Sequence, residues 1–170
     1  GYGSLIYKVD FPYREREVAT LRGWERRFWQ GSHDHRGTPE APGRVVTLIR
    51  APDALCRGVA YLVEEAVFEH LDHREKNGYE RHRTRLYLDH REQTVTGTFY
   101  VAATDNPAFL GPQDDRALAQ HIARSHGPSG SNADYLLQLA GALRELGEYD
   151  QHVMDLEREL LALRGSAADG

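Results

Sequence analysis

Hydrophobic and polar positions follow two different periods along this chain of 170 residues. In the first two-thirds, short apolar or alternating segments rich in β-branched residues are typical of strands. Regular segments of this kind occupy residues 45–50, 57–63, 81–90 and 94–103, and a less regular one occupies 17–29. The pair 81–90 and 94–103 predicts a long hairpin, which suits a curved sheet or the wall of a barrel.

One segment inside this strand-rich region has the period of a helix. Residues 64–76 place apolar side chains on one side, including Val67 and Leu71, and Gly78 follows as a stop signal. After residue 103 the helical period takes over. This period predicts three helices, and Pro112 and Asp114 open the first of them.

The second of these helices is predicted to be capped by Asn132 and stopped by Gly147. A third covers about residues 150–163, with apolar residues at spacings of three and four. Strands therefore come first and helices last, which predicts an α+β protein rather than a βαβ repeat. We expect a single domain over residues 1–164 and a flexible tail at 165–170.

Composition narrows the class of partner. The formal net charge is −5, the isoelectric point is near 6.0, and no apolar run approaches the ~20 residues of a membrane span. Neither nucleic acid nor a membrane is the expected partner. Arginines gather at 22–27 and 81–91, where they either meet a small anion or are solvated. The lone cysteine, Cys56, fits a reducing, cytoplasmic setting and is either a small core residue or a nucleophile.

The opening sequence GYGSL, residues 1–5, contains two glycines around Tyr2. Glycines let backbone N–H groups converge on one oxygen, because no Cβ blocks the approach. This segment is therefore either a tight turn or a cradle for a carboxylate or oxyanion. A second cluster, GPSGSN at 127–132, is either a loop with a helix cap or a helix start that binds an anion. Tyr135 follows this cluster, and its side chain either packs in the core or reaches a ligand.

Glu75 lies at the predicted end of the first helix. Most such glutamates are solvated surface groups. A helix C-terminus carries partial negative charge, so a carboxyl group there is expected to have a raised pKa if it is also partly buried. That property suits a general base that works near neutral pH.

Nine histidines raise the possibility of a metal site, and two pairs have short spacing, His33 with His35 and His70 with His73. Neither pair has an evident third ligand, and no HExxH or zinc-type Cys/His spacing occurs. No GxSxG, GxGxxG or P-loop sequence is present either. We therefore expect neither a metal nor a nucleotide cofactor.

Taken together, the segments resemble the ChaC-like, glutathione-specific γ-glutamylcyclotransferases, in order and over nearly the whole chain. The matching segments are GYGSLIYKVDFPY at 1–13, RRFWQGSHDHRGTPEAPGRVVTL at 26–48, HREKNGY at 73–79, DNPAFLGP at 105–112 and GPSGSNADYL at 127–136. Two positions depart mildly from the family pattern, Tyr7 where tryptophan is usual and Asp134 where glutamate is usual.

The resemblance implies a γ-glutamylcyclotransferase-like fold, a small mixed β-barrel with flanking helices and a helical C-terminal third. It implies a lyase that cleaves glutathione to 5-oxoproline and cysteinylglycine, without a cofactor, as a monomer or homodimer. Glu75 is the implied general acid/base. The implied substrate-binding residues are Tyr2, Gly3, Ser4, Leu5 and Tyr135.

Arg36, in the HRG sequence, is a further candidate for binding the glycine-end carboxylate, because a guanidinium pairs bidentately with carboxylates. A structural ion pair is the alternative for this residue. Two other functions remain open: a cyclotransferase for other γ-glutamyl amines or peptides, and a non-catalytic regulatory protein of the same fold.

Overall fold

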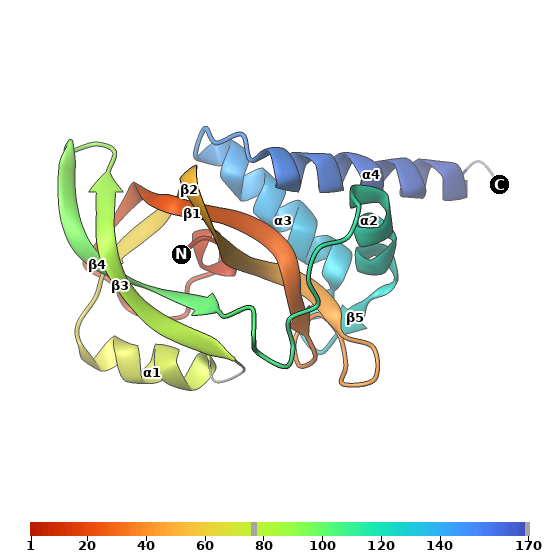
Figure 1. Ribbon diagram of the computed structural model, residues 1–170, viewed down its shortest axis with the longest axis horizontal. Helices are drawn as coiled ribbons and strands as arrows, with labels where there is room; N and C mark the ends of the chain where they lie inside the picture. The colour runs from red at the N-terminus through yellow and green to blue at the C-terminus, as the bar shows by residue number, and fades with distance from the viewer. Residues whose placement is uncertain (76–77, 169–170) are drawn as a thin grey trace. The chain divides into compact units, whose positions relative to one another are not determined.

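The computed structural model describes residues 1–75 and 78–168, and the contacts within it separate two compact units (Figure 1). Unit 1 comprises Gly1–Arg26 and Leu48–Pro107, and unit 2 comprises Arg27–Thr47 and Ala108–Gly170. The long strands β1 (Glu15–Ser32) and β2 (Gly43–Leu62) each supply residues to both units.

The main sheet has four strands in the order β2-β1-β3-β4. The two shorter ones are β3 (Tyr79–Leu88) and β4 (Gln93–Ala102), and β3 runs antiparallel to both β1 and β4. They form the predicted hairpin, visible in green in Figure 1, in continuous register from the Tyr79–Ala102 pair to the Leu88–Gln93 pair.

The prediction of a closed barrel was wrong. Within the described residues the sheet is open, with β2 and β4 as its edges. A barrel closes only when its last strand pairs with its first. Alternation of apolar residues reports which side chains face a core, but it carries no information about which strand edges join, so the sequence could not distinguish a curved open sheet from a barrel.

β1 is irregular for a reason that lies in one glycine. Ala19 and Leu21 are buried, and then Trp24 and Arg26 are buried, so the alternation changes phase between residues 21 and 24. Gly23 lies at that point with a φ of 83°, a left-handed conformation that strongly favours glycine. The extra residue turns Trp24 back to the core face.

β2 is one strand of 20 residues where the sequence predicted two. Pro52 and Asp53, which are poor strand formers, separate the predicted pair but are exposed in the continuous strand. Tertiary context therefore overrides the local propensity of the segment between the two apolar runs.

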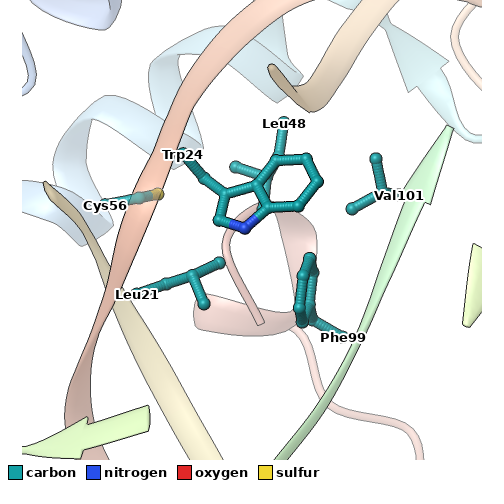
Figure 2. Close-up of a cluster of buried hydrophobic side chains, with 6 residues drawn as sticks. All are labelled: Leu21, Trp24, Leu48, Cys56, Phe99 and Val101. Carbon is teal, nitrogen blue, oxygen red and sulfur yellow. The ribbon is translucent and has the colours of Figure 1, made fainter. Parts of the chain in front are cut away.

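Unit 1 has two apolar clusters. In the first, shown in Figure 2, the indole of Trp24 lies among side chains from three strands. Its other buried members are Leu21, Leu48, Cys56, Phe99 and Val101. In the second, Val67 and Leu71 of helix α1 (Ala66–Arg74) pack with Phe11. Cys56 is buried in the first of these clusters, which agrees with the interpretation of Cys56 as a small core residue.

Unit 2 is built mainly from three helices that pack on one another: α2 (Asp115–Arg124), α3 (Asn132–Glu145) and α4 (Gln151–Ala168). Their fully buried side chains include Leu118, Ile122, Leu136, Leu139, Leu143, Val153, Leu156 and Leu160. The two-residue strands β5 (His126–Gly127) and β6 (Gly130–Ser131) pair between α2 and α3. Residues 165–168, which were predicted to be a flexible tail, continue α4 as helix.

The helix ends follow ordinary capping rules with one correction. The Asp114 side chain caps α2 by accepting from the Ala117 amide, as predicted. α3 is capped by Ser131, whose hydroxyl accepts from the Asp134 amide, so the prediction that Asn132 is the cap was wrong. Gly147 follows α3 with a φ of 72°, as its stop role requires. Among the described residues, no helix is long and apolar enough to cross a membrane.

Candidate active site

The GYGSL segment forms a short 3₁₀ helix, η1 (Ser4–Ile6), directly after Gly3. The Ile6 amide donates to the Gly3 carbonyl at 3.0 Å, which is the first bond of the helix. The amides of Gly3, Ser4 and Leu5 precede that bond, so they have no acceptor within the helix. Amides in such a position are suited to bind an oxygen atom of a ligand.

Several hydrogen bonds hold this segment against the rest of unit 1. Gly1 and Val59 exchange backbone hydrogen bonds of 2.7 and 2.9 Å. The Tyr2 hydroxyl donates to the Tyr100 carbonyl, and Arg26, itself buried, donates to the Tyr2 carbonyl, both at 2.6 Å. The Tyr61 hydroxyl donates to the carbonyl of Leu5 at 2.6 Å. The segment is therefore fixed by its backbone, which leaves its amides in a set position.

Gly58 explains how the segment comes so close to β2. A Cβ at this position would lie 2.3 Å from the Gly1 carbonyl oxygen, a distance that no side chain tolerates. Burial raises the pKa of Tyr61, so this phenol stays a neutral donor to Leu5 over the physiological range.

Glu75 terminates α1. Its amide donates to the Leu71 carbonyl at 2.9 Å, and its backbone angles, φ −93° and ψ 20°, leave the helical region. The side chain is 21% exposed, so this carboxylate is partly buried while it still reaches solvent. Lys76, the last residue of the predicted helix, and Asn77, within the HREKNGY motif, lie outside the described residues.

Arg74 connects Glu75 with the GYGSL segment. Its Nε lies 4.0 Å from Glu75 Oε1, one terminal nitrogen donates to Ser4 Oγ at 3.3 Å, and the other donates to Asp10 Oδ1 at 2.9 Å. Two candidate residues that are 71 positions apart therefore share one guanidinium. We call Ser4, Asp10, Arg74 and Glu75 the Arg74 cluster.

The sequence reasoning missed Arg74 and Asp10. Arg74 stands next to Glu75 in the HREKNGY motif, so its position was an available signal. Asp10 lies in the matching segment at 1–13, but no neighbouring candidate residue singled it out, because its carboxylate meets Arg74 only through the fold.

A neighbouring network ties β4 to α1. The Tyr100 hydroxyl donates to Asp72 Oδ1, and Arg81 pairs with Asp72 Oδ2 at 3.3 Å. Burial and the Asp72 carboxylate raise the pKa of Tyr100. The contact of Tyr100 with the GYGSL segment is a separate one, made by its backbone carbonyl, which accepts from the Tyr2 hydroxyl.

Arg36 and Tyr135 belong to unit 2. The Arg36 guanidinium donates to the Ser131 carbonyl at 3.1 Å and lies 5.7 Å from the centre of the Tyr135 ring. Tyr135 is buried, its hydroxyl accepts from the Val46 amide at 3.3 Å, and its ring packs edge-on against Phe28. Their roles toward a substrate stay predictions.

Unit 2 also contains a buried polar group that the sequence reasoning interpreted differently. The Asn132 side chain accepts from the Arg44 amide and donates to the Arg44 carbonyl, both at 2.7 Å. The Arg44 guanidinium donates to the carbonyls of Phe28 and Gly111 and to the Gln113 side chain. Desolvation lowers the pKa of Arg44. We call Arg44 and Asn132 with these partners the Arg44 cluster.

The histidine pairs do not gather with further ligands in the part of the chain that the structure describes, where no three His, Cys, Asp or Glu side chains form a group that could hold a metal ion. His70 lies 3.6 Å from Asp10, and His35 contacts Ser129 at 3.0 Å.

Comparison with known proteins decides the family. The family model described as ChaC-like protein matches residues 1–162. The chain belongs to the ChaC-like family. A relative from Arabidopsis thaliana named gamma-glutamylcyclotransferase 2-3 is 41% identical, with 94% of this chain and 86% of that protein covered. Glutathione-specific gamma-glutamylcyclotransferase 1 of Danio rerio is 40% identical, with coverages of 95% and 87%.

Solved structures agree with this assignment. A crystal structure of the yeast γ-glutamyl cyclotransferase specific to glutathione matches this ChaC-like chain with a TM-score of 0.87 and 33% identity, covering 95% of this chain and 94% of that one. A further γ-glutamyl cyclotransferase structure has a TM-score of 0.58 at 14% identity, which supports the fold alone. The fold is thus the α+β fold of γ-glutamylcyclotransferases.

Proposed function

We propose that this ChaC-like chain is a γ-glutamylcyclotransferase that degrades glutathione to 5-oxoproline and cysteinylglycine. The relatives that are about 40% identical over most of the chain carry that activity in their names. The structural observation that supports the proposal is the Arg74 cluster, in which the proposed acid/base Glu75 and Ser4 of the amide-bearing η1 contact the same guanidinium.

The reaction needs no nucleophilic side chain and no water. The α-amine of the γ-glutamyl group attacks its own γ-carbonyl, and a lactam C–N bond forms as the bond to the cysteinyl nitrogen breaks. The attacking α-ammonium loses two protons on becoming the lactam N–H, and the departing amide nitrogen gains two on leaving as the ammonium of cysteinylglycine, so protons balance. Because the nucleophile is intramolecular, holding the chain folded back on itself supplies much of the acceleration.

Each candidate residue of unit 1 has a chemical role in this reaction. Glu75 takes protons from the attacking nitrogen, one at a time, and passes them to the leaving amine, for which a partly buried carboxylate that still reaches solvent is suited. The amides of Gly3, Ser4 and Leu5 bind the α-carboxylate or the oxyanion, and Tyr2 anchors that segment. Cys56 is buried in the apolar cluster, which favours its core role over a nucleophilic one.

Two further assignments complete the proposal. Tyr135 is proposed to line the substrate, and Arg36 is proposed to bind the glycine-end carboxylate. We propose a cytoplasmic location, where glutathione keeps thiols reduced, because the chain has a single cysteine.

One assay tests the function. Purified protein is incubated with reduced glutathione, and 5-oxoproline and cysteinylglycine are quantified by mass spectrometry. We expect both products in equal amounts and at a rate proportional to enzyme concentration, because each turnover yields one of each.

A parallel incubation with γ-glutamyl-alanine tests the scope of the activity. Release of 5-oxoproline from γ-glutamyl-alanine but not from glutathione would replace glutathione with other γ-glutamyl amines as the substrate class. No release from either substrate would contradict the proposed activity and favour a regulatory protein of the same fold.

A further inference from the structure

We propose that Arg74 is a positioning residue for the reaction: it holds the Glu75 carboxylate in its ionised form and fixes it relative to η1. This inference rests on the proposed function, since it assigns a role around the proposed acid/base. It names a residue that acts through Glu75 and Ser4 rather than on the substrate itself.

The geometry of the guanidinium carries the inference. All three of its nitrogens are used: Nε faces Glu75 at 4.0 Å, and the two terminal nitrogens donate to Asp10 at 2.9 Å and Ser4 at 3.3 Å. A planar fork that contacts three groups fixes their mutual arrangement in a way that the single point charge of a lysine cannot. The Arg74 side chain is 26% exposed, so its interactions are screened only in part.

The three contacts come from distant parts of the chain. Glu75 follows α1, Ser4 begins η1, and Asp10 lies in the segment between η1 and β1. A merely structural bridge would need only Asp10 and Ser4. The additional approach to Glu75 places the same cation beside the group that must gain and lose a proton.

The charges around Glu75 determine the direction of the effect. Arg74 is a cation that faces it within the described residues, while Asp10 is an anion that the same guanidinium neutralises and that His70 approaches at 3.6 Å. His73, on the last turn of α1, is exposed. A cation beside a carboxylate favours its ionised form, so removing Arg74 disfavours the base and leaves Asp10 without its nearest cation.

Kinetics of three variants test the proposal. Arg74→Met removes the charge and the fork, Arg74→Lys restores only the charge, and Arg81→Met is the matched control. Arg81 also pairs with an acidic residue of α1, Asp72, at 3.3 Å, but it contacts neither Glu75 nor Ser4 in the described structure.

We expect Arg74→Met to lower kcat by about 10- to 100-fold with KM changed by less than about threefold. We also expect the acidic limb of its kcat/KM profile to move upward by about one pH unit. Arg74→Lys should restore the pH limb but only part of kcat, and Arg81→Met should leave both unchanged. A purely structural role predicts instead a lower melting temperature with kcat and the pH limb of the folded enzyme unaltered, which would overturn the proposal.

A second measurement does not depend on turnover. With ¹³C-labelled glutamate side chains, the Glu75 carboxyl signal is assigned by its loss in Glu75→Gln and is titrated in each variant. We expect its midpoint to rise in Arg74→Met and to stay near wild type in Arg74→Lys and Arg81→Met. An unchanged midpoint in Arg74→Met overturns the proposal even if the enzyme is active. A wild type that does not cleave glutathione contradicts the proposed function, while the titration still decides the role of Arg74.

Discussion

Two arginine-centred clusters, one in each unit, use the same side chain in opposite ways. Arg74 is partly exposed and faces two carboxylates and a hydroxyl. Arg44 is buried and, among the described residues, donates only to carbonyl and amide oxygens. Charges that compensate each other near solvent can change during a reaction at modest cost. A buried cation held by neutral acceptors serves to satisfy the backbone, and its removal leaves those acceptors unpaired.

This comparison predicts that substitutions in the Arg74 cluster affect activity more than stability, and that substitutions in the Arg44 cluster do the reverse.

Glu75→Gln should lower kcat by about 10²- to 10⁴-fold, because proton transfer loses its acid/base while the side chain keeps its shape. The melting temperature should change little, since the carboxylate is partly exposed and Arg74 keeps its hydrogen bonds to Asp10 and Ser4 when Glu75 is neutral. Product release from glutathione and thermal unfolding are measured on the same preparations.

The matched control is Glu69→Gln, an exposed glutamate on the same helix, which should leave both quantities unchanged. If Glu75→Gln retained more than about a tenth of wild-type kcat, the acid/base assignment would have to be abandoned. If it unfolded, the division between the two clusters would fail.

Asn132→Ala should lower stability while it leaves activity nearly unchanged. The Asn132 side chain satisfies both the amide and the carbonyl of Arg44, and it is completely buried. Leaving two buried backbone groups unpaired costs about 2–5 kcal/mol, which lowers the melting temperature by about 5–15 °C. The kcat of the folded fraction, measured well below the transition, should remain within about threefold of wild type.

Ser131→Ala provides the comparison for this variant. Ser131 is the actual cap of α3, and losing a capping hydroxyl costs about 1 kcal/mol. Asn132→Ala should therefore be clearly less stable than Ser131→Ala. Equal melting temperatures would mean that Asn132 contributes no more than a cap, as the sequence alone suggested.

The two clusters also show what a sequence can and cannot predict. Helix α1, its end near Glu75 and the stop at Gly147 follow from local periodicity and capping chemistry, which a sequence contains. The Arg74–Asp10 pair and the Arg44–Asn132 pair join residues 64 and 88 positions apart. Such pairings are set by the packed fold, so a single sequence does not reveal them.

Asn132 shows why a correct local rule selected the wrong residue. Asparagine and serine are both good caps, and they are adjacent at positions 131 and 132. Ser131 caps the helix because the Asn132 side chain is buried against Arg44. A carboxamide both donates and accepts, so it can bond to the amide and the carbonyl of Arg44 at once. The competing long-range demand decided the outcome. The same limit explains the open sheet, since strand closure is also a long-range property.

The smallest expected effect concerns His121, which borders the Arg44 cluster. Its Nε2 donates to the Pro42 carbonyl at 2.7 Å. Desolvation, together with the nearby Arg44 and Arg124 cations, lowers the pKa of His121 below its ordinary value, although the Pro42 bond opposes this shift. The folded state therefore binds this proton less readily than the unfolded state does. Stability from this group is complete above the ordinary histidine pKa of about 6.5 and is lost as the pH falls below it.

His121→Gln should remove that acid sensitivity, because a glutamine amide can still donate to Pro42 but does not titrate. Melting temperatures of wild type and variant are compared at pH 7.5 and 5.5, so that contributions from other groups cancel. The wild type should lose more stability on acidification than the variant, by less than the Ser131→Ala effect, because the ring is only half buried. An equal loss in both proteins would mean that burial and the Arg44 and Arg124 cations do not disfavour the protonated form of His121. The view of that cluster as a buried cation whose charge acts on its surroundings would then have to be revised.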